Sequence, residues 1–559
     1  MKLSGAEIIV ETLLEQGCTK TFGYPGGAVL DIFDALYVNR DRIQNIRTAH
    51  EQGAAHAADG YARATGKVGV VIATSGPGAT NLVTGIATAH LDSVPMVAIT
   101  GNVATSLIGK DSFQEVNITG ITMPITKHNY FVSDVSKLAK VIRGAFSIAK
   151  SGRPGPVLID VPKDVLTAKT DYKKQDTAPF IELPEADEKL IAAAAKEIAK
   201  CKRPYIYCGG GVIAANAGEE IMALAEKTDA YIGSSMMGLS AVPDSHPRFL
   251  GMQGMHGRFK SSKALDECDL LVVVGGRFSD RSTGDKNKYA RHAKIIQFDA
   301  DVAEVNKNIS VTLGIVGNVK KALQSLIEKV PEMRHEEWEK RVNELRAEEQ
   351  KQVSELAWKS ELTPFKLIEA VRKEAGTDTP VATDVGQHQL WTTQHYAFEK
   401  PRTCITSGGL GTMGFGMGAA IGASVGTGKR AVLFTGDGSF GMNLNELATL
   451  AAYQIPVIIV IMNNTVLGNV RQWQTMFYNK HYSNTDLVGT PDYMLLGEAF
   501  GIKGYVINEL SELEPTIHEA FAHEGSAIID CRINKDEFVL PMIPPGGSME
   551  NILVQHLGD

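Results

Sequence analysis

AVLFTGDGSFGMNLNELATLAAYQIPVIIVIMNN (431–464) contains two continuous apolar runs with a helical segment between them. Apolar strands of this kind are buried on both faces, as in parallel sheets that are covered by helices. A right-handed crossover brings both strand ends to the same carboxyl edge, where open α/β sheets bind ligands. The stretch therefore predicts an α/β fold with a binding site at Asp437 and Asn464.

The same pattern recurs along the whole chain. Similar runs that end in glycine or polar residues are VGVVIATSGPG (68–78), PMVAITG (95–101), PVLIDVP (156–162) and LLVVVGG (270–276). A chain of 559 residues is too long for a single hydrophobic core. We therefore predict three doubly wound parallel-sheet domains. We place them at 1–170, 190–330 and 360–535, followed by a C-terminal tail at 536–559.

Two stretches between these domains differ in composition from their surroundings. Residues 176–190 are acidic and contain proline, which is typical of a linker. Residues 332–357 form a charge-dense helical pattern with few core-forming side chains. We interpret this second stretch as a solvated connecting helix.

The composition excludes several classes of partner and location. A formal net charge of −8 provides no basic surface for nucleic acid or for an anionic membrane. The chain contains no run of 18 apolar residues, and its first residues do not resemble a signal peptide. The 6 cysteines are scattered without a CxxC pair, which favours reduced thiols. We expect a cytoplasmic enzyme.

The polar residues that follow the two quoted strands suit a metal-bound diphosphate. Mg²⁺ takes hard oxygen ligands, and Asp437, Asn464 and the carbonyl of Val466 can provide three. Gly436 and Gly438 let the backbone approach phosphates closely. Two ordinary turns are the alternative, and GDG alone would favour it. GDG followed at this spacing by NN, on two predicted strands, favours the metal site.

The pair of motifs resembles the metal and diphosphate motif of thiamine-diphosphate enzymes. The resemblance implies that Mg²⁺ and the diphosphate bind the third domain, while a homologous domain of another subunit holds the aminopyrimidine. That domain must supply a glutamate, and Glu51 in AHEQGAAHAADGYARATG (49–66) fits. Its carboxylate would favour the imino tautomer that removes the thiazolium proton. An isolated glutamate at a helix start is more often a cap or dipole partner.

The resemblance then extends over nearly the whole chain. Segments that carry it are FGYPGGAVLDIFDAL (22–36), TSGPGATNLVTGIATAHLDSVPMVAITG (74–101), GRPGPVLIDVPKDV (152–165), VLGNVRQWQTMFY (466–478) and VLPMIPPGG (539–547). Their order and spacing resemble the large, catalytic subunit of acetohydroxyacid synthase (acetolactate synthase). The resemblance implies that two pyruvates form 2-acetolactate and CO₂, or that pyruvate and 2-ketobutyrate form 2-aceto-2-hydroxybutyrate, in branched-chain amino acid biosynthesis. It also implies a homodimer or tetramer and a small regulatory subunit.

Carried over position by position, the resemblance assigns the substrate site. Gly27 would lie beside the reacting centre, and Gln114 and Lys127 would line the substrate channel. Arg281 would clamp the carboxylate of the second 2-keto acid, because a guanidinium matches a carboxylate with two hydrogen bonds. Trp473 would form an apolar wall that favours 2-ketobutyrate. A surface arginine and a core tryptophan are the alternatives.

The resemblance also assigns two cofactor sites. Thiamine diphosphate would contact Glu51, Gln387, His388, Gly411, Met413, Gly436, Asp437, Gly438, Ser439, Asn464, Leu467 and Gly468. Met413 would bend the cofactor, although a methionine also fills gaps in ordinary cores. FAD would contact Arg153, Gly209, Gly210, Gly211, Met237, His256, Gly257, Gly276, Arg277, Arg281 and Asp299. Ser279 and Asn318 depart from the family pattern, which bears on the affinity for FAD.

Three other functions remain open at this point. A pyruvate oxidase would use the flavin for redox chemistry, and the set Gln114, Lys127, Arg281 and Trp473 argues against it. RFSDR (277–281) argues against a flavin-free catabolic acetolactate synthase. Retention of Glu51, Asp437 and Asn464 argues against a non-catalytic scaffold.

Overall fold

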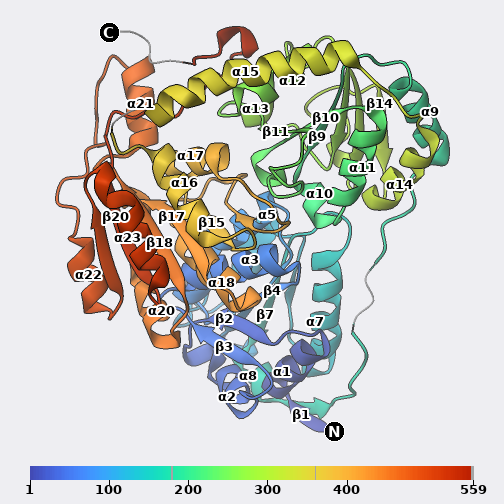
Figure 1. Cartoon of the computed structure of the whole chain (residues 1–559). Coiled ribbons are helices and arrows are strands. Elements are labelled where there is room, and N and C mark those ends of the chain that lie inside the picture. The colour runs from blue at the N-terminus through green and yellow to red at the C-terminus, as the bar shows by residue number, and fades with distance from the viewer. Residues whose placement is uncertain (178–180, 359–360, 555–559) are drawn as a thin grey trace.

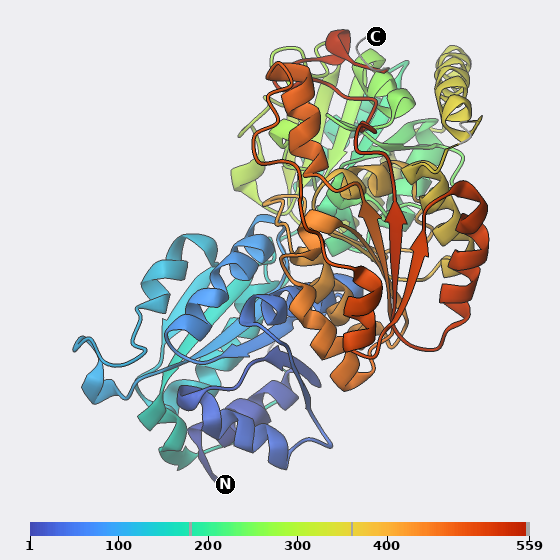
Figure 2. The same ribbon diagram turned by 90° about the vertical axis from the view of Figure 1, so that its left-hand side faces the viewer.

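The computed structural model describes residues 1–177, 181–358 and 361–554 (Figure 1). The chain forms three 6-stranded parallel sheets with helices on their faces, which confirms the predicted α/β class. In Figure 2 the first domain (blue) lies at the lower left, the third (orange to red) at the right and the middle domain (green) above. The described helices include none long and apolar enough to cross a membrane.

The first sheet has the strand order β3-β2-β4-β5-β7-β6. Its strands are β2 (Lys20–Gly23), β3 (Gln44–Arg47), β4 (Gly69–Ala73), β5 (Met96–Asn102), β6 (His128–Phe131) and β7 (Pro156–Pro162). The main helices around it are α1 (Gly5–Glu15), α2 (Leu30–Val38), α3 (Glu51–Thr65), α5 (Val83–Leu91) and α7 (Val135–Lys150). A short antiparallel pair, β1 (Lys2–Ser4) and β8 (Lys169–Asp171), joins the two ends of the domain.

The third sheet repeats this topology with the order β16-β15-β17-β18-β20-β19. Its strands are β15 (Val381–Thr383), β16 (Cys404–Ile405), β17 (Ala431–Gly436), β18 (Val457–Asn463), β19 (Lys503–Ile507) and β20 (Ala527–Arg532). The helices include α16 (Pro364–Ala375), α17 (Gln387–His395), α18 (Phe415–Thr427), α20 (Leu447–Tyr453), α22 (Tyr493–Ala499) and α23 (Leu510–Ala522). Counted along the chain, both outer sheets therefore have the order 2-1-3-4-6-5.

The middle sheet differs and has the order β11-β10-β9-β12-β13-β14. Its strands are β9 (Pro204–Cys208), β10 (Tyr231–Ser234), β11 (Phe249–Met252), β12 (Leu270–Val274), β13 (Lys294–Asp299) and β14 (Leu313–Val316). Helices α9 (Glu188–Ile198), α11 (Gly218–Thr228), α12 (Phe259–Glu267) and α14 (Val319–Lys329) accompany it. This is the order 3-2-1-4-5-6 of dinucleotide-binding folds, in which ligands bind where the strand order reverses, here between β9 and β12.

Helices α3 and α18 join the first and third domains in direct backbone contact. A Cβ atom on Gly60 would lie 2.2 Å from the carbonyl oxygen of Ala419, and one on Gly422 would lie 1.8 Å from that of Ala57. Only glycine permits so close an approach. The two helices lie beside each other at the centre of the molecule (Figure 1).

The charge-dense stretch after the middle sheet forms one long helix, α15 (Glu336–Trp358). The interpretation of it as a solvated connector is wrong for its first half. Trp338, Val342 and Leu345 are fully buried against the middle domain, and Trp338 Nε1 donates a 3.2 Å hydrogen bond to the carbonyl of Pro204. These apolar residues recur at helical spacing, so they form a narrow stripe that the surrounding charges conceal in the sequence.

Candidate active site

The carboxyl edge of the third sheet brings the predicted metal ligands together. Asp437 begins the short helix α19 (Asp437–Phe440) directly after β17, and Asn464 follows β18. Asn464 Oδ1 accepts a 3.2 Å hydrogen bond from the backbone N–H of Val466. Burial raises the pKa of Asp437 to about 6, and its Oδ2 has no hydrogen-bond partner within the described part of the chain. A buried, unpaired carboxylate is costly unless a cation binds it, so this edge fits Mg²⁺.

The predicted diphosphate ligands lie at the same edge. Gln387 Oε1 accepts a 3.3 Å hydrogen bond from Asn464 Nδ2, and a Cβ atom on Gly468 would lie 1.9 Å from this oxygen. A Cβ atom on Gly436 would lie 2.8 Å from His388 Nδ1. Burial lowers the pKa of His388 to about 3, so its ring is neutral at pH 7. Its Nε2 has no protein partner among the described residues and is available to a ligand.

The loop 406–414 borders this edge on its other side. The backbone N–H of Gly414 donates a 2.8 Å hydrogen bond to Asp384 Oδ1, and Met413 is half-buried on the loop. Asp384 itself is buried, and burial raises its pKa. Asp384 was not among the predicted site residues, although its position directly after the strand-like run PVAT (380–383) is a signal that could have indicated it.

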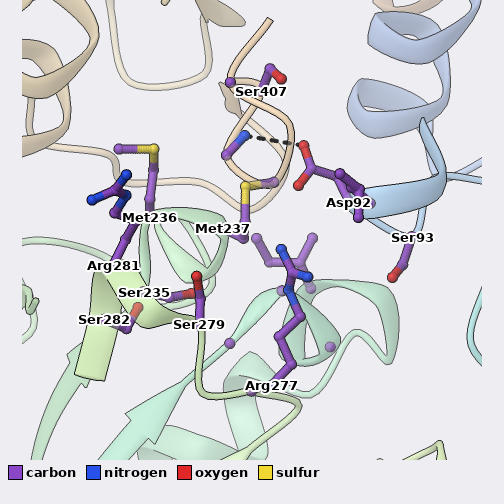
Figure 3. A pocket seen from close by; sticks show the side chains of 18 of the residues that line it. Asp92, Ser93, Ser235, Met236, Met237, Arg277, Ser279, Arg281, Ser282 and Ser407 are labelled. Carbon is purple, nitrogen blue, oxygen red and sulfur yellow. Dashed lines mark hydrogen bonds between the residues drawn. The ribbon is translucent and has the colours of Figure 1, made fainter. Parts of the chain in front are cut away.

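A cavity of about 1320 Å³ lies where all three domains meet. Predicted FAD and substrate residues that line it are Arg153, Gly209, Gly210, Gly211, Met237, His256, Gly276, Arg277, Arg281, Asp299 and Trp473, and Gly411 of the predicted thiamine-diphosphate set lines it as well. Figure 3 shows Met237 at its wall, between Ser407 of the third domain above and Arg277 below. Gly257 does not line this cavity and packs instead against the backbone of Gln253.

The cavity opens at the ends of β9 and β12, where the strand order of the middle sheet reverses. The turn after β9 and the turn after β12 are in backbone contact, because a Cβ atom on Gly209 would lie 2.0 Å from the carbonyl oxygen of Gly275. Asp299 follows along the edge, and burial raises its pKa to about 6. His256 Nδ1 is buried without a partner in the described chain. A glycine-lined crevice with unpaired polar groups at this position fits an extended dinucleotide.

The two residues that depart from the family pattern both lie at helix starts. Ser279 occupies the N-cap position of the short helix α13 (Asp280–Thr283), but its hydroxyl donates to Asp280 Oδ1 at 3.3 Å and makes no capping hydrogen bond. Asn318 Oδ1 accepts a 3.1 Å hydrogen bond from the N–H of Lys321 and so caps α14. Both residues line the cavity.

Arg281 and Trp473 meet at the end of the cavity that adjoins the third domain. The Arg281 guanidinium carbon lies 5.9 Å from the centre of the Trp473 ring, and Arg281 Nη1 lies 3.8 Å from Met255 Sδ. The side chain of Arg281 is 60% exposed, and its carboxylate neighbour Asp280 is 3.8 Å away. The guanidinium can therefore reach a carboxylate ligand beside an apolar wall.

Three of the four predicted catalytic residues of the first domain form a separate group around the loop that follows β4. A Cβ atom on Gly78 would lie 3.1 Å from Glu51 Oε1, and one on Gly76 would lie 2.9 Å from the Cα of Gln114. Glu51 Oε2 accepts a 3.0 Å hydrogen bond from Asn81 Nδ2. Gly27, on the neighbouring turn, has open space where a Cβ would stand. Within one chain these residues do not line the cavity.

Lys127 is held away from the cavity. Its Nζ donates to the carbonyl oxygens of Ser151 and, at 2.6 Å, Ile148, close to the end of α7. Burial lowers the pKa of Lys127 to about 8. That Lys127 lines the substrate channel stays a prediction.

Two carboxylates that no sequence motif indicated link the domains. Asp92 accepts hydrogen bonds from the backbone N–H groups of Gly408 and Gly409 (Figure 3). Glu446 accepts hydrogen bonds from the backbone N–H groups of Ala49 and His50, directly before α3. Backbone N–H groups have no sequence signature, so pattern analysis could not pair these positions.

Comparison with known proteins places this site in a family. Three family models match in order: the N-terminal TPP binding domain of thiamine pyrophosphate enzymes at 3–121, their central domain at 191–326 and their C-terminal TPP binding domain at 384–531. A probable acetolactate synthase large subunit of Methanocaldococcus jannaschii is 43% identical over 99% of this chain and 95% of its own length. The acetolactate synthase large subunit of Corynebacterium glutamicum is 43% identical over 99% and 90%. The isozyme 2 large subunit of Escherichia coli is 41% identical over 99% of both chains. The chain therefore belongs to the acetolactate synthase large-subunit family of thiamine pyrophosphate enzymes.

Proposed function

We propose that this chain is a catalytic subunit that decarboxylates pyruvate and joins the remaining two-carbon fragment to a second 2-keto acid. The products are 2-acetolactate from pyruvate and 2-aceto-2-hydroxybutyrate from 2-ketobutyrate, as branched-chain amino acid biosynthesis requires. The observation that carries the proposal is the pairing of Arg281 with Trp473, in which an exposed guanidinium lies beside an apolar wall. A simple decarboxylase needs no site for the carboxylate of a second keto acid.

Thiamine diphosphate supplies the nucleophilic carbon and the electron sink when it is bound. Asp437, Asn464 and the carbonyl of Val466 would hold Mg²⁺, which the unpaired Oδ2 of Asp437 supports. The neutral ring of His388 and the amide of Gln387 would bind the diphosphate. The carboxylate of Glu51 would form a hydrogen bond to the pyrimidine ring. This bond would control proton transfer at the reacting carbon.

Each active site would require two copies of the chain. The group around Glu51 lies apart from the cavity that contains Arg281 and Trp473, so a second chain would have to supply it. Large apolar side chains are exposed near both half-sites, such as Leu30 and Phe113 in the first domain and Met442 in the third. Exposed apolar surface of this kind is typical of an interaction site. The minimal active unit would be a homodimer, which can pair further into a tetramer.

FAD would occupy the cavity at the reversal of strand order in the middle sheet. The close approach of Gly209 to Gly275 and the unpaired Nδ1 of His256 support a dinucleotide there. Carboligation involves no net electron transfer, so the flavin would have a structural role. The large-subunit names of the relatives support a small regulatory partner for this chain as well.

The test is to incubate the purified protein with pyruvate, thiamine diphosphate and Mg²⁺ and to identify the product. Acetolactate is the expected product, and addition of 2-ketobutyrate should yield 2-aceto-2-hydroxybutyrate. Acetaldehyde would indicate a decarboxylase, and acetate or acetyl phosphate would indicate an oxidase. A Glu51→Gln variant should lose activity by about two orders of magnitude or more while it retains Mg²⁺-dependent diphosphate binding.

A further inference from the structure

The loop 406–414 of the third domain is fixed by a carboxylate of the first domain. Asp92 Oδ1 accepts a 2.7 Å hydrogen bond from the N–H of Gly409, and Oδ2 accepts a 3.1 Å bond from the N–H of Gly408. Figure 3 shows the Asp92 carboxylate directed at this loop. The two bonds together hold one short stretch of backbone in a single orientation.

Arg63 supports the contact between Asp92 and the loop by bonding to both. Its Nη2 donates a 2.9 Å hydrogen bond to Asp92 Oδ2, and its Nη1 donates a 2.9 Å bond to the carbonyl of Thr406. Asp59 binds the same guanidinium, and all three charged side chains are at least nine-tenths buried. Charges that are buried and fully hydrogen-bonded resist displacement, because removal of one partner leaves the others uncompensated.

One side of the loop forms part of the wall of the dinucleotide cavity. Ser407, Gly408 and Gly411 line the cavity together with Asp92. Met237 Sδ would lie 2.4 Å from a Cβ atom on Gly408, and Arg277 Nη2 would lie 2.9 Å from one on Gly409. A ligand that packs on Met237 and Arg277 therefore presses on this loop.

The other end of the loop borders the metal and diphosphate edge. The hydroxyl groups of Thr412 and Thr88 are 2.7 Å apart and buried. Gly414 donates its N–H to Asp384, and its carbonyl oxygen accepts a hydrogen bond from Asn443, which lies just beyond α19. The loop therefore contacts two sites within a few residues. One end lines the dinucleotide cavity, and the other end bonds to residues that border the metal and diphosphate edge.

We propose that Asp92 is a positioning residue that couples the two ligand sites through this loop. Occupancy of the cavity by a flavin dinucleotide stabilises the orientation in which Asp92 holds the loop, and thereby raises the affinity of the third domain for thiamine diphosphate. Coupling of this kind is reciprocal, so thiamine diphosphate raises the affinity for the flavin by the same factor. The inference rests on the proposed function, because it takes FAD as the ligand of the cavity.

The test compares thiamine diphosphate binding, with Mg²⁺ present, to flavin-free and FAD-loaded protein by titration calorimetry. For the wild-type protein we expect FAD to lower the Kd by at least about fivefold, which is the lower end of typical allosteric coupling. Asp92→Asn keeps the shape of the side chain but removes its charge, and we expect the ratio of the two Kd values to fall to about one. The matched control is Asp160→Asn, which makes the same change at a buried carboxylate of the first domain that does not line the cavity and should preserve the ratio.

Thr88→Val provides a second variant that leaves the buried charges untouched. It removes the α5 hydroxyl that bonds Thr412 at the far end of the loop, and should reduce the ratio in part, whether or not Asp92→Asn folds. If the wild type binds both cofactors but its two thiamine-diphosphate Kd values are equal, the coupling is overturned and the proposed function stands. A Kd ratio that stays at the wild-type value in both variants would overturn the coupling in the same way. Failure of the wild type to bind FAD would overturn the flavin part of the proposed function and the coupling together.

Discussion

The Oε1 atom of Glu446 accepts a 3.1 Å hydrogen bond from the backbone N–H of His50, across the boundary between the third and first domains. Its Oε2 atom accepts a second bond of 3.1 Å from the N–H of Ala49. Gly53 provides the necessary space, because a Cβ atom there would lie 2.0 Å from Glu446 Oε1. A negative charge at a helix N-terminus is favourable, so Glu446 fixes the start of α3 and with it the position of Glu51.

Glu446→Gln should therefore lower kcat for acetolactate formation by about tenfold, which corresponds to roughly 1.4 kcal/mol in the barrier. The amide keeps the shape of the side chain but leaves one of the two backbone donors without an acceptor. Steady-state kinetics measure the effect, with Glu220→Gln in the middle domain as a control for loss of a buried carboxylate. Equal kcat values for the two variants would contradict the role of Glu446.

Gly209→Ala should abolish most of the flavin binding. The added methyl group would meet the carbonyl oxygen of Gly275 at 2.0 Å, so the two turns that frame the crevice must separate. We expect the wild-type protein to be yellow and the variant to bind FAD at least about tenfold more weakly. Visible absorbance and titration with FAD measure this. The control is Gly144→Ala in α7, where the new Cβ would make ordinary contact at 3.5 Å.

Arg281→Lys should lower kcat/KM for the acceptor keto acid by about 10- to 100-fold, a loss of roughly 1.4 to 2.7 kcal/mol. A lysine keeps the charge but cannot bind a carboxylate through two parallel hydrogen bonds.

Trp473→Leu should instead erode the preference for 2-ketobutyrate over pyruvate at a similar total rate. The ratio of the two products, measured with both acceptors present, separates these effects. A wild-type ratio in Trp473→Leu would reject the apolar-wall role.

Trp338→Ala should lower the free energy of unfolding of the middle domain by about 3 to 5 kcal/mol, as is typical of a buried aromatic. The indole is fully buried and its Nε1 is bonded to the carbonyl of Pro204, which the variant leaves unpaired. Urea unfolding measures the loss. Lys340→Ala, on the exposed face of the same helix, should change stability by less than about 0.5 kcal/mol. Equal stabilities of the two variants would show that α15 is only a connector.

Asp160 should make the stability depend on pH. Burial raises its pKa to about 6, while Thr100 and Asn102 donate hydrogen bonds to its oxygens. The folded pKa exceeds the unfolded value, so the contribution to stability is complete at low pH and is lost as the pH rises through about 6. Relative to Asp160→Asn, the stability of the wild type should fall by roughly 1 kcal/mol between pH 5 and pH 7.5. A pH-independent difference would place the pKa outside this window.

The parts of the site that sequence analysis could predict are those that depend on local order along the chain. Asp437 and Asn464 each follow an apolar strand, and a crossover of known handedness places them at one edge. The pairing of Asp92 with Gly409 and of Glu446 with His50 joins positions 317 and 396 residues apart through backbone N–H groups. Such groups are present at almost every position, so no residue pattern distinguishes the ones that are used. The buried stripe of α15 was missed for another reason, because charged neighbours mask its few apolar members.

The contact between α3 and α18 limits how relatives of this protein can exchange parts. Gly60 and Gly422 lie in different domains, yet each leaves room for the backbone of the other helix. A chimera that takes its first domain from one parent and its third from another would combine helix surfaces from two different proteins. A single methyl group added at the position of Gly60 or Gly422 would push the two domains apart. Exchange should succeed where α3 and α18 come from the same parent. The pair thus constrains both domains as one unit, although its two halves are encoded far apart.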